Sequence, residues 1–167
     1  MAYLAGNRVI ITEKKVKDRL IEKGYGEKEE KVLVLSLFEA LYLLEKGKLE
    51  VEDVKGKKLT EKDLIRKAKE KLFYNKFVVF RDLRDRGFVV KTGFKFGFDF
   101  RVYPRGKKPG EEHTQWVINV SPQEARCSFP EFSRMVRMAG NLRTTLLQAI
   151  VDSENQVNYY EIKRITP

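Results

Sequence analysis

The sequence predicts a mixed α/β fold of the α+β type, divided into a small mixed N-terminal module over residues 1–70 and a C-terminal unit over residues 71–167. The first observation is that short apolar stretches typical of strands alternate with segments whose apolar residues recur at helical spacing. The second is a change of composition near Leu72, after which strand-like sequence predominates. Hydrophobic residues make up 42% of the 167 residues, which is enough to bury a core.

Four elements are predicted in the N-terminal module. Residues 8–11 form a strand, and residues 16–23 form a helix that ends at Gly24. Residues 32–44 form a second helix, because their apolar residues have the spacing of one helical face: Leu33, Leu37, Phe38, Leu41 and Leu44. A near capping box at Thr60 and Asp63 opens a third helix, which runs to about residue 73.

The C-terminal unit begins with a predicted strand over residues 76–80, which are apolar and β-branched. Apolar residues then alternate with mostly polar ones in the clearest periodicity of the chain: Phe94, Phe96, Phe98, Phe100 and Val102. A period of two predicts a strand with one buried and one polar face. Tyr103 falls on the polar face.

The rest of the C-terminal unit contains a loop, a helix and three strands. Two prolines and two glycines predict a loop over residues 104–112, followed by a strand over residues 113–120. Ser128 and Glu131 form a predicted capping box, and the helix that they open ends at Gly140 and buries Phe132, Val136 and Ala139. Two strands follow, over residues 143–151 and 156–165.

Charge and composition narrow the class of protein. The chain has 34 Lys and Arg against 24 Asp and Glu, a formal net charge of +10 at pH 7, which favours a polyanion such as nucleic acid as the partner. A heat-adapted surface is the alternative explanation. The single cysteine, Cys127, excludes an intrachain disulfide and a cysteine-based metal cluster. We expect a cytoplasmic protein, since neither a signal peptide nor an apolar stretch of the ~20 residues that a membrane span needs is found.

Tyr103 and His113 flank the predicted loop. If the strands on either side pair as a hairpin, both residues lie at its mouth beside four cations: Arg101, Arg105, Lys107 and Lys108. Histidine can give or take a proton near neutral pH, and cationic side chains can hold a phosphate where charge develops. The sequence therefore predicts acid–base chemistry at this loop.

Two motifs in this region identify a resemblance. Residues 80–93 read FRDLRDRGFVVKTG, and they are followed by Gly97, by DFR at residues 99–101 and by Tyr103. The pattern closely resembles that of the archaeal tRNA-intron (tRNA-splicing) endonucleases, a family with thermophilic members. The similarity extends from Leu33 to the C-terminus and, more loosely, over the first thirty residues. It implies a C-terminal mixed β-sheet of the restriction-endonuclease-like fold with flanking helices.

The reaction that the resemblance implies is the cutting of pre-tRNA at a bulge–helix–bulge element, without a metal or any other cofactor. The ribose 2′-hydroxyl attacks the neighbouring phosphate, which leaves a 2′,3′-cyclic phosphate and a 5′-hydroxyl. Tyr103 matches the family's tyrosine, which deprotonates or orients the 2′-hydroxyl. His113 matches the histidine that protonates the leaving oxygen.

The third catalytic residue of the family is a lysine in a pattern like VRKxL. The corresponding stretch here reads NLRTTL, so Thr144 stands at the position of the lysine. Threonine cannot supply a cation to the charge that develops on the phosphate, a contribution of ~3 kcal/mol. We therefore expect an impaired enzyme that still binds RNA. The alternatives are that Arg143 substitutes for the lysine, which strand alternation disfavours, or that the alignment slips by one residue.

The resemblance also implies RNA contacts and subunit contacts. Arg137 matches an arginine that sandwiches a bulged base, and we expect three more cations to bind RNA: Arg101, Lys107 and Lys108. Asp152 and Glu154 lie in the turn that matches the family's acidic loop, which docks into a basic pocket of a neighbouring subunit. A single catalytic unit of this length implies assembly. A homotetramer is expected, with an α2β2 heterotetramer as the alternative.

Two other classes of protein are weighed against this one. The first is a metal-dependent nuclease, because Asp152 followed by Glu161 and Lys163 fits a loose D…ExK pattern in which two carboxylates hold Mg²⁺. The second is a non-catalytic, RNA-binding partner subunit of a heteromeric splicing endonuclease. The missing lysine suits that second class, whereas the presence of both Tyr103 and His113 counts against it.

Overall fold

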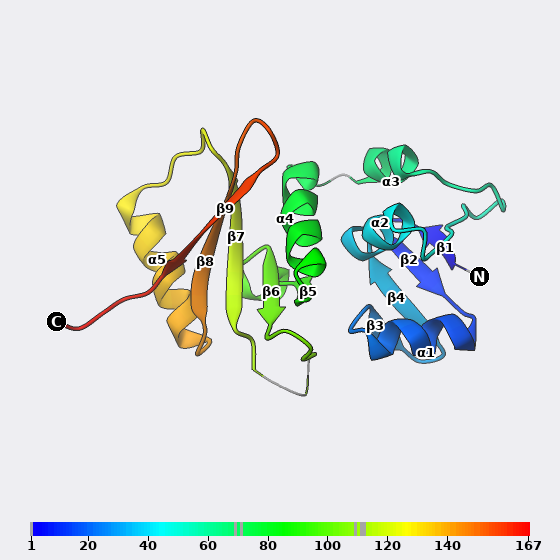
Figure 1. Ribbon diagram of the computed structural model, residues 1–167, viewed down its shortest axis with the longest axis horizontal. Helices are drawn as coiled ribbons and strands as arrows, with labels where there is room; N and C mark the ends of the chain where they lie inside the picture. The colour runs from blue at the N-terminus through cyan, green and yellow to red at the C-terminus, as the bar shows by residue number, and fades with distance from the viewer. Residues whose placement is uncertain (1, 69, 71, 109, 111–112) are drawn as a thin grey trace. The chain divides into compact units, whose positions relative to one another are not determined.

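The computed structural model describes residues 2–68, 70, 72–108, 110 and 113–167. The chain divides into two compact units, Met1–Tyr74 and Asn75–Pro167, each with its own sheet (Figure 1). In the described part of the chain, no helix has the length and apolar character needed to cross a membrane.

The N-terminal unit is a four-stranded antiparallel sheet with three helices. Its strands lie in the order β1-β2-β4-β3: β1 (Ala2–Ala5), β2 (Arg8–Ile11), β4 (Val32–Ser36) and β3 (Glu27–Glu29). The helices are α1 (Lys14–Glu22), α2 (Leu37–Glu45) and α3 (Glu61–Lys67). The strand predicted at residues 8–11 is confirmed.

The single helix predicted over residues 32–44 is wrong, because Ser36 divides the segment into β4 and α2. The Ser36 side chain accepts a hydrogen bond from the Glu39 N–H, and the Glu39 carboxylate accepts one from the Ser36 N–H. This capping box starts a helix at Leu37, while residues 32–35 are apolar at every position, as in a buried strand. The apolar residues of β4 and α2 together resemble one helical face only because both elements are buried.

The capping box predicted at Thr60 and Asp63 is confirmed at the start of α3. Hydrogen bonds from the Thr60 backbone and hydroxyl lower the pKa of the Asp63 carboxyl. The predicted length is wrong, since α3 ends at Lys67 and Ala68 has an extended backbone.

The C-terminal unit is a five-stranded mixed sheet with a helix on each face (Figure 1). Its strands lie in the order β5 (Val89–Thr92), β6 (Phe100–Tyr103), β7 (Trp116–Pro122), β8 (Thr145–Val151) and β9 (Val157–Ile162). Neighbouring strands are antiparallel except β7 and β8, which are parallel and joined by α5 (Phe129–Asn141). The other helix is α4 (Phe73–Asp85).

The strand predicted at residues 76–80 is wrong, because these residues lie inside α4. Phe77, Val78, Val79 and Phe80 are all buried, so the segment is apolar without a visible helical period. A short apolar run of this kind fits a buried helix as well as a buried strand. Packing decides between them: the Phe80 ring lies against that of Phe100, with centroids 5.9 Å apart.

The long alternating strand predicted from Phe94 is also wrong. Residues Phe94–Phe96 form a 3-10 turn, η1, which ends at Gly97 in the left-handed conformation. Phe94 and Phe96 are exposed by 51% and 38%, whereas Phe98 and Phe100 are buried. Tyr103 is only 5% exposed, contrary to its predicted place on a polar face. Polar and apolar residues do not alternate cleanly along β6, because this inner strand is covered on both faces of the sheet.

The capping serine predicted for the next helix is confirmed, since the Ser128 hydroxyl accepts from the Glu131 N–H at the start of α5. The helix continues one residue past Gly140. Its buried face differs from the prediction, because Phe132 is 38% exposed. A core cluster of Phe98, Val117, Ala139 and Leu146 holds α5 on one face of the sheet. On the other face, the Tyr159 hydroxyl of β9 donates to Asp82 of α4 at 2.7 Å.

Candidate functional site

The ends of three strands meet at one edge of the C-terminal sheet. Val102 of β6 is opposite Trp116 of β7, which in turn is opposite Thr145 of β8. The next row of residues toward the edge contains Tyr103, which follows Val102, and Thr144, which precedes Thr145. Two strand spacings of about 4.8 Å place the two backbones about 10 Å apart. The hairpin predicted around the loop is confirmed, and Thr144 joins its open end through tertiary structure alone.

Tyr103 ends β6 with its ring buried. Nη1 of Arg101 donates to the Tyr103 hydroxyl oxygen at 3.3 Å, so the two side chains lie on the same face of the sheet. Arg101 is opposite Val117, which belongs to the core cluster under α5, so this is the α5 face of the sheet. Leu146, two residues along from Thr144, belongs to the same cluster, so strand alternation puts Thr144 on that face as well.

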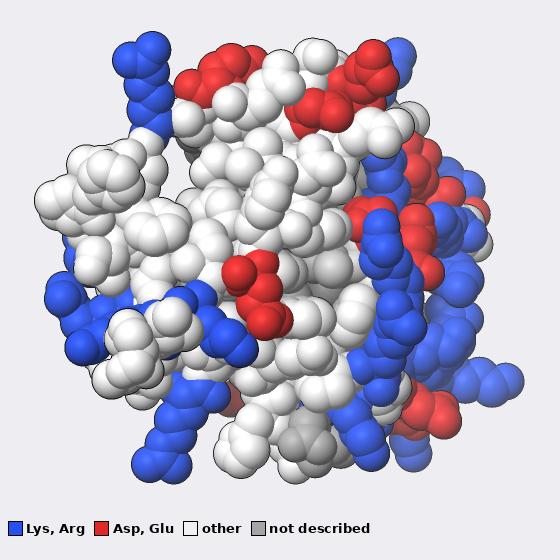
Figure 2. All heavy atoms as spheres, turned by 60° about the vertical axis from the view of Figure 1, so that its left-hand side comes forward, with Lys and Arg blue, Asp and Glu red and all other residues white. Residues whose placement is uncertain are grey.

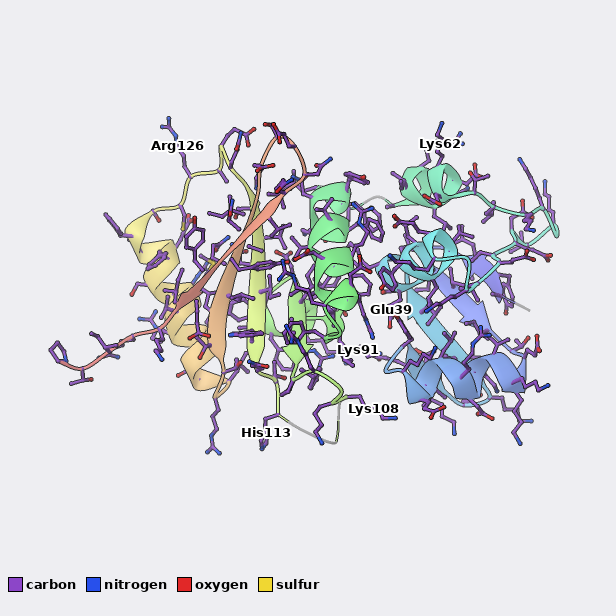
Figure 3. All side chains as sticks on the ribbon, viewed as in Figure 1. Glu39, Lys62, Lys91, Lys108, His113 and Arg126 are labelled. Atoms are coloured by element: carbon purple, nitrogen blue, oxygen red, sulfur yellow. The ribbon has the colours of Figure 1, made fainter. Side chains whose placement is uncertain are left out.

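His113 lies before β7, which begins at Trp116 rather than at His113 as predicted. Figure 3 shows its side chain at the outer end of the loop, with Lys108 on the loop's other side. His113 and Lys107 are exposed, and Lys108 is half-buried. Arg105 lies over the Phe88 ring, with Cζ 4.9 Å from the centroid. Along the chain, three cations of the loop thus lie between Tyr103 and the only histidine: Arg105, Lys107 and Lys108.

The side chain of Thr144 offers no charge at this edge, and its backbone N–H forms a hydrogen bond to the Ala139 carbonyl at 3.1 Å. Its Oγ1 is buried and has no hydrogen-bond partner among the described residues. Arg143, just before it, has a left-handed backbone (φ 57°) and an exposed side chain. Because Arg143 has a left-handed and not an extended backbone, strand alternation does not set the direction of its side chain, contrary to the sequence argument.

Two other predicted sites are on α5 and in the β8–β9 turn. Arg137 is exposed on α5. Asp152 shapes the β8–β9 turn, where its Oδ1 accepts from the backbone N–H groups of Glu154 and Gln156, both at 2.9 Å. Glu154 itself is exposed. The Asp152 carboxylate thus holds the backbone of the turn in place, and the Glu154 carboxylate faces the solvent.

The metal-site interpretation of Asp152 and Glu161 is wrong. Glu161 is opposite Leu147, five residues along β8 from Asp152, so about 17 Å of strand separates the two positions. Two carboxylates that share one ion lie within a few ångströms of it. Glu161 also accepts a hydrogen bond from the Trp116 indole at 2.8 Å. Within the described ranges, no group of three His, Cys, Asp or Glu residues could hold a metal ion.

Two residues at this site carried no sequence signal. Thr92 accepts a hydrogen bond from Arg101 Nε through its backbone carbonyl, at 2.9 Å. The Phe96 ring lies beside the same guanidinium, with its centroid 5.5 Å from Cζ. A backbone carbonyl has no sequence signature, and Phe96 was assigned to a strand face.

The structure defines a mixed α/β protein of two units, in which the second unit has a mixed five-stranded sheet with one helix on each face. Comparison with known proteins narrows the class. Residues 1–65 match the N-terminal domain of the tRNA intron endonucleases, and residues 73–159 match their catalytic C-terminal domain. The chain belongs to the tRNA intron endonuclease family, as its motifs predict.

Similar proteins named tRNA-splicing endonuclease occur in several thermophilic archaea. The chain is 43% identical to the one from Thermococcus kodakarensis, over 96% of this chain and 95% of that protein. It is 40% identical to the one from Pyrococcus abyssi, over 98% and 95% of the two chains. For Methanothermobacter thermautotrophicus the identity is 39%, over 86% and 84%. Family and endonuclease class are thereby established.

Proposed function

We propose that this chain cuts pre-tRNA introns at bulge–helix–bulge elements without a metal ion and leaves 2′,3′-cyclic phosphate and 5′-hydroxyl ends. The observation that carries the proposal is the shared sheet edge: Tyr103, the start of β7 shortly after His113, and Thr144 meet there within the unit that matches the family's catalytic domain. An acid, a base and nearby cations are sufficient for this reaction, because the nucleophile belongs to the RNA.

In the proposed reaction, Tyr103 accepts or orients the proton of the ribose 2′-hydroxyl. The bond between O2′ and phosphorus forms, and the bond between phosphorus and O5′ breaks. His113 gives a proton to the departing O5′. Arg137, Lys107 and Lys108 hold the RNA, Arg137 by stacking on an unpaired base. Thr144 leaves the charge that develops on the phosphate without its lysine, so the reaction proceeds slowly.

A cleavage assay tests the proposal directly. We expect the purified chain to cut a pre-tRNA containing a bulge–helix–bulge element at the same rate with and without EDTA. The 5′ product should carry a 2′,3′-cyclic phosphate, detectable by its resistance to phosphatase before acid treatment. Loss of cleavage in EDTA, or a 3′-hydroxyl end, would rule out the proposed mechanism.

We propose a homotetramer as the working assembly, with an α2β2 complex as the second candidate. Figure 2 supports self-association, because the middle of the face that it shows is mostly uncharged, with one acidic side chain near its centre, while most Lys, Arg, Asp and Glu side chains lie toward the rim. The β8–β9 turn, with Asp152 and Glu154, is the proposed docking element on a +10 chain.

Glu154→Lys is expected to lower the assembly state, because it reverses the charge that the turn presents. Light scattering should give about four times 19.6 kDa for the unaltered chain and a smaller mass for the variant. Glu124→Lys is the matched control, an exposed residue outside the turn. A monomer before mutation, together with activity that appears only on mixing with a second subunit, would favour the partner-subunit alternative.

A further inference from the structure

The Arg101 guanidinium is held at three points inside the protein. Its Nε donates to the backbone carbonyl of Thr92 at 2.9 Å, and its Nη1 donates to the Tyr103 hydroxyl oxygen at 3.3 Å. The Phe96 ring lies on it, with the ring centroid 5.5 Å from Cζ. Arg101 thus spans from the carbonyl of β5 to the phenol at the end of β6.

We propose that Arg101 is the positioning residue of Tyr103 rather than an RNA ligand. This inference rests on the proposed function, since it concerns how the tyrosine of that reaction is prepared. It revises the sequence-based expectation that Arg101 contacts RNA together with Lys107 and Lys108.

The geometry separates Arg101 from the loop cations. A guanidinium has five N–H donors in a rigid plane, and here two of them are directed at protein acceptors while the ring covers part of one side. The side chain is half-buried, whereas Lys107 is exposed on the loop. A phosphate contact that drew on the N–H groups held by Thr92 and Tyr103 would leave a buried phenol without its donor, which is costly.

The contact suits the chemistry of the phenol. Because the arginine is always charged, it can only donate, so the Tyr103 oxygen must accept from it. That bond fixes the side chain of Tyr103 and leaves its own O–H and second lone pair for the substrate. It also places a cation next to the phenol oxygen that meets the ribose 2′-hydroxyl in the proposed reaction. Phe96 and the Thr92 carbonyl keep the guanidinium in this orientation.

Arg101→Met removes the charge and the N–H donors of the guanidinium while keeping an apolar stem of similar length. We expect the single-turnover rate constant to fall about 100-fold, as for a small misplacement of a catalytic group. RNA affinity and its salt dependence should stay unchanged. Lys107→Met is the matched comparison: it should weaken binding and lower the slope of log K against log salt by about one, as for a lost phosphate contact.

Two further variants should lower the cleavage rate by smaller amounts. Arg101→Lys keeps the charge but cannot reach both acceptors in the same way, so it should restore part of the rate. Phe96→Ala keeps Arg101 and removes only the ring, so a loss of about 3-fold is expected. Thermal unfolding of each variant shows that the assay measures folded protein, and Phe96→Ala tests the network if Arg101→Met unfolds.

A double-mutant cycle with Tyr103→Phe separates the inference from the proposed function. If Arg101 acts through the phenol, adding Arg101→Met to Tyr103→Phe should cost no further rate. Additive losses, weaker RNA binding with a lower salt slope, or an unchanged rate in Arg101→Met would overturn the inference while the proposed function stands. If Tyr103→Phe alone cleaves like the unaltered chain, the proposed role of Tyr103 fails instead.

Discussion

Thr144→Lys is expected to raise the single-turnover rate constant of pre-tRNA cleavage by about 100-fold, because a cation that meets charge developing in the transition state contributes on that order. Thr144 lies on the sheet edge and on the face of Tyr103, and its hydroxyl has no partner among the described residues. The lysine therefore displaces no hydrogen bond. Its aliphatic stem can lie in the half-buried site with the ammonium group in water.

Two controls separate charge from shape in this experiment. Thr144→Met has a similar length without charge, and Thr144→Val has the shape of threonine without the unpartnered hydroxyl. Neither should speed cleavage. If Thr144→Lys cleaves no faster than the unaltered chain, the idea that the missing lysine limits the rate is wrong. A rate that then falls in Arg143→Gln would identify Arg143, whose exposed side chain precedes β8, as the source of the cation.

His113→Ala is expected to lower the rate constant by about 100-fold to 10,000-fold, the range for loss of a general acid or base. His113 is the only histidine of the chain and is exposed at the outer end of the loop (Figure 3), so little stability should be lost with it. Single-turnover cleavage at saturating enzyme measures the chemical step, and a binding assay shows whether RNA affinity is retained.

A modified substrate distinguishes an acid from a structural residue. Sulfur in place of the leaving O5′ departs without a proton, so His113→Ala and the unaltered chain should cut this RNA at similar rates. A variant that remains equally slow on the sulfur substrate would contradict the role of His113 as the acid. Lys107→Met is the comparison, because its defect lies in binding and should persist on both substrates.

Secondary structure was predicted correctly from the sequence where it depends on contacts between residues close together along the chain. The capping residues Ser128 and Thr60 are correct because a cap is a contact across three residues. The segment at residues 76–80 failed because every position is buried and its period is hidden. Phe94 and Phe96 failed for another reason: a turn at Gly97 interrupts the alternation, and alternation by itself does not reveal a turn.

The candidate site shows the same division. The motif containing Tyr103 and the single histidine at position 113 identified the loop, and the match of both units to the tRNA intron endonucleases confirms the family. Sequence also marked Thr144 as the exception within that pattern. These are statements about which residue stands at which position, and they need no coordinates.

Tertiary structure decided which of those residues meet. The parallel pairing of β7 with β8 brings Thr144 to the edge where Tyr103 ends β6, although forty residues separate them along the chain. The antiparallel pairing of β8 with β9 moves Asp152 away from Glu161 and removes the metal interpretation. The fold around η1 makes Arg101 the partner of a buried phenol, a contact that the sequence did not reveal. Strand register and burial are long-range properties of the packed sheet, so local sequence patterns do not determine them.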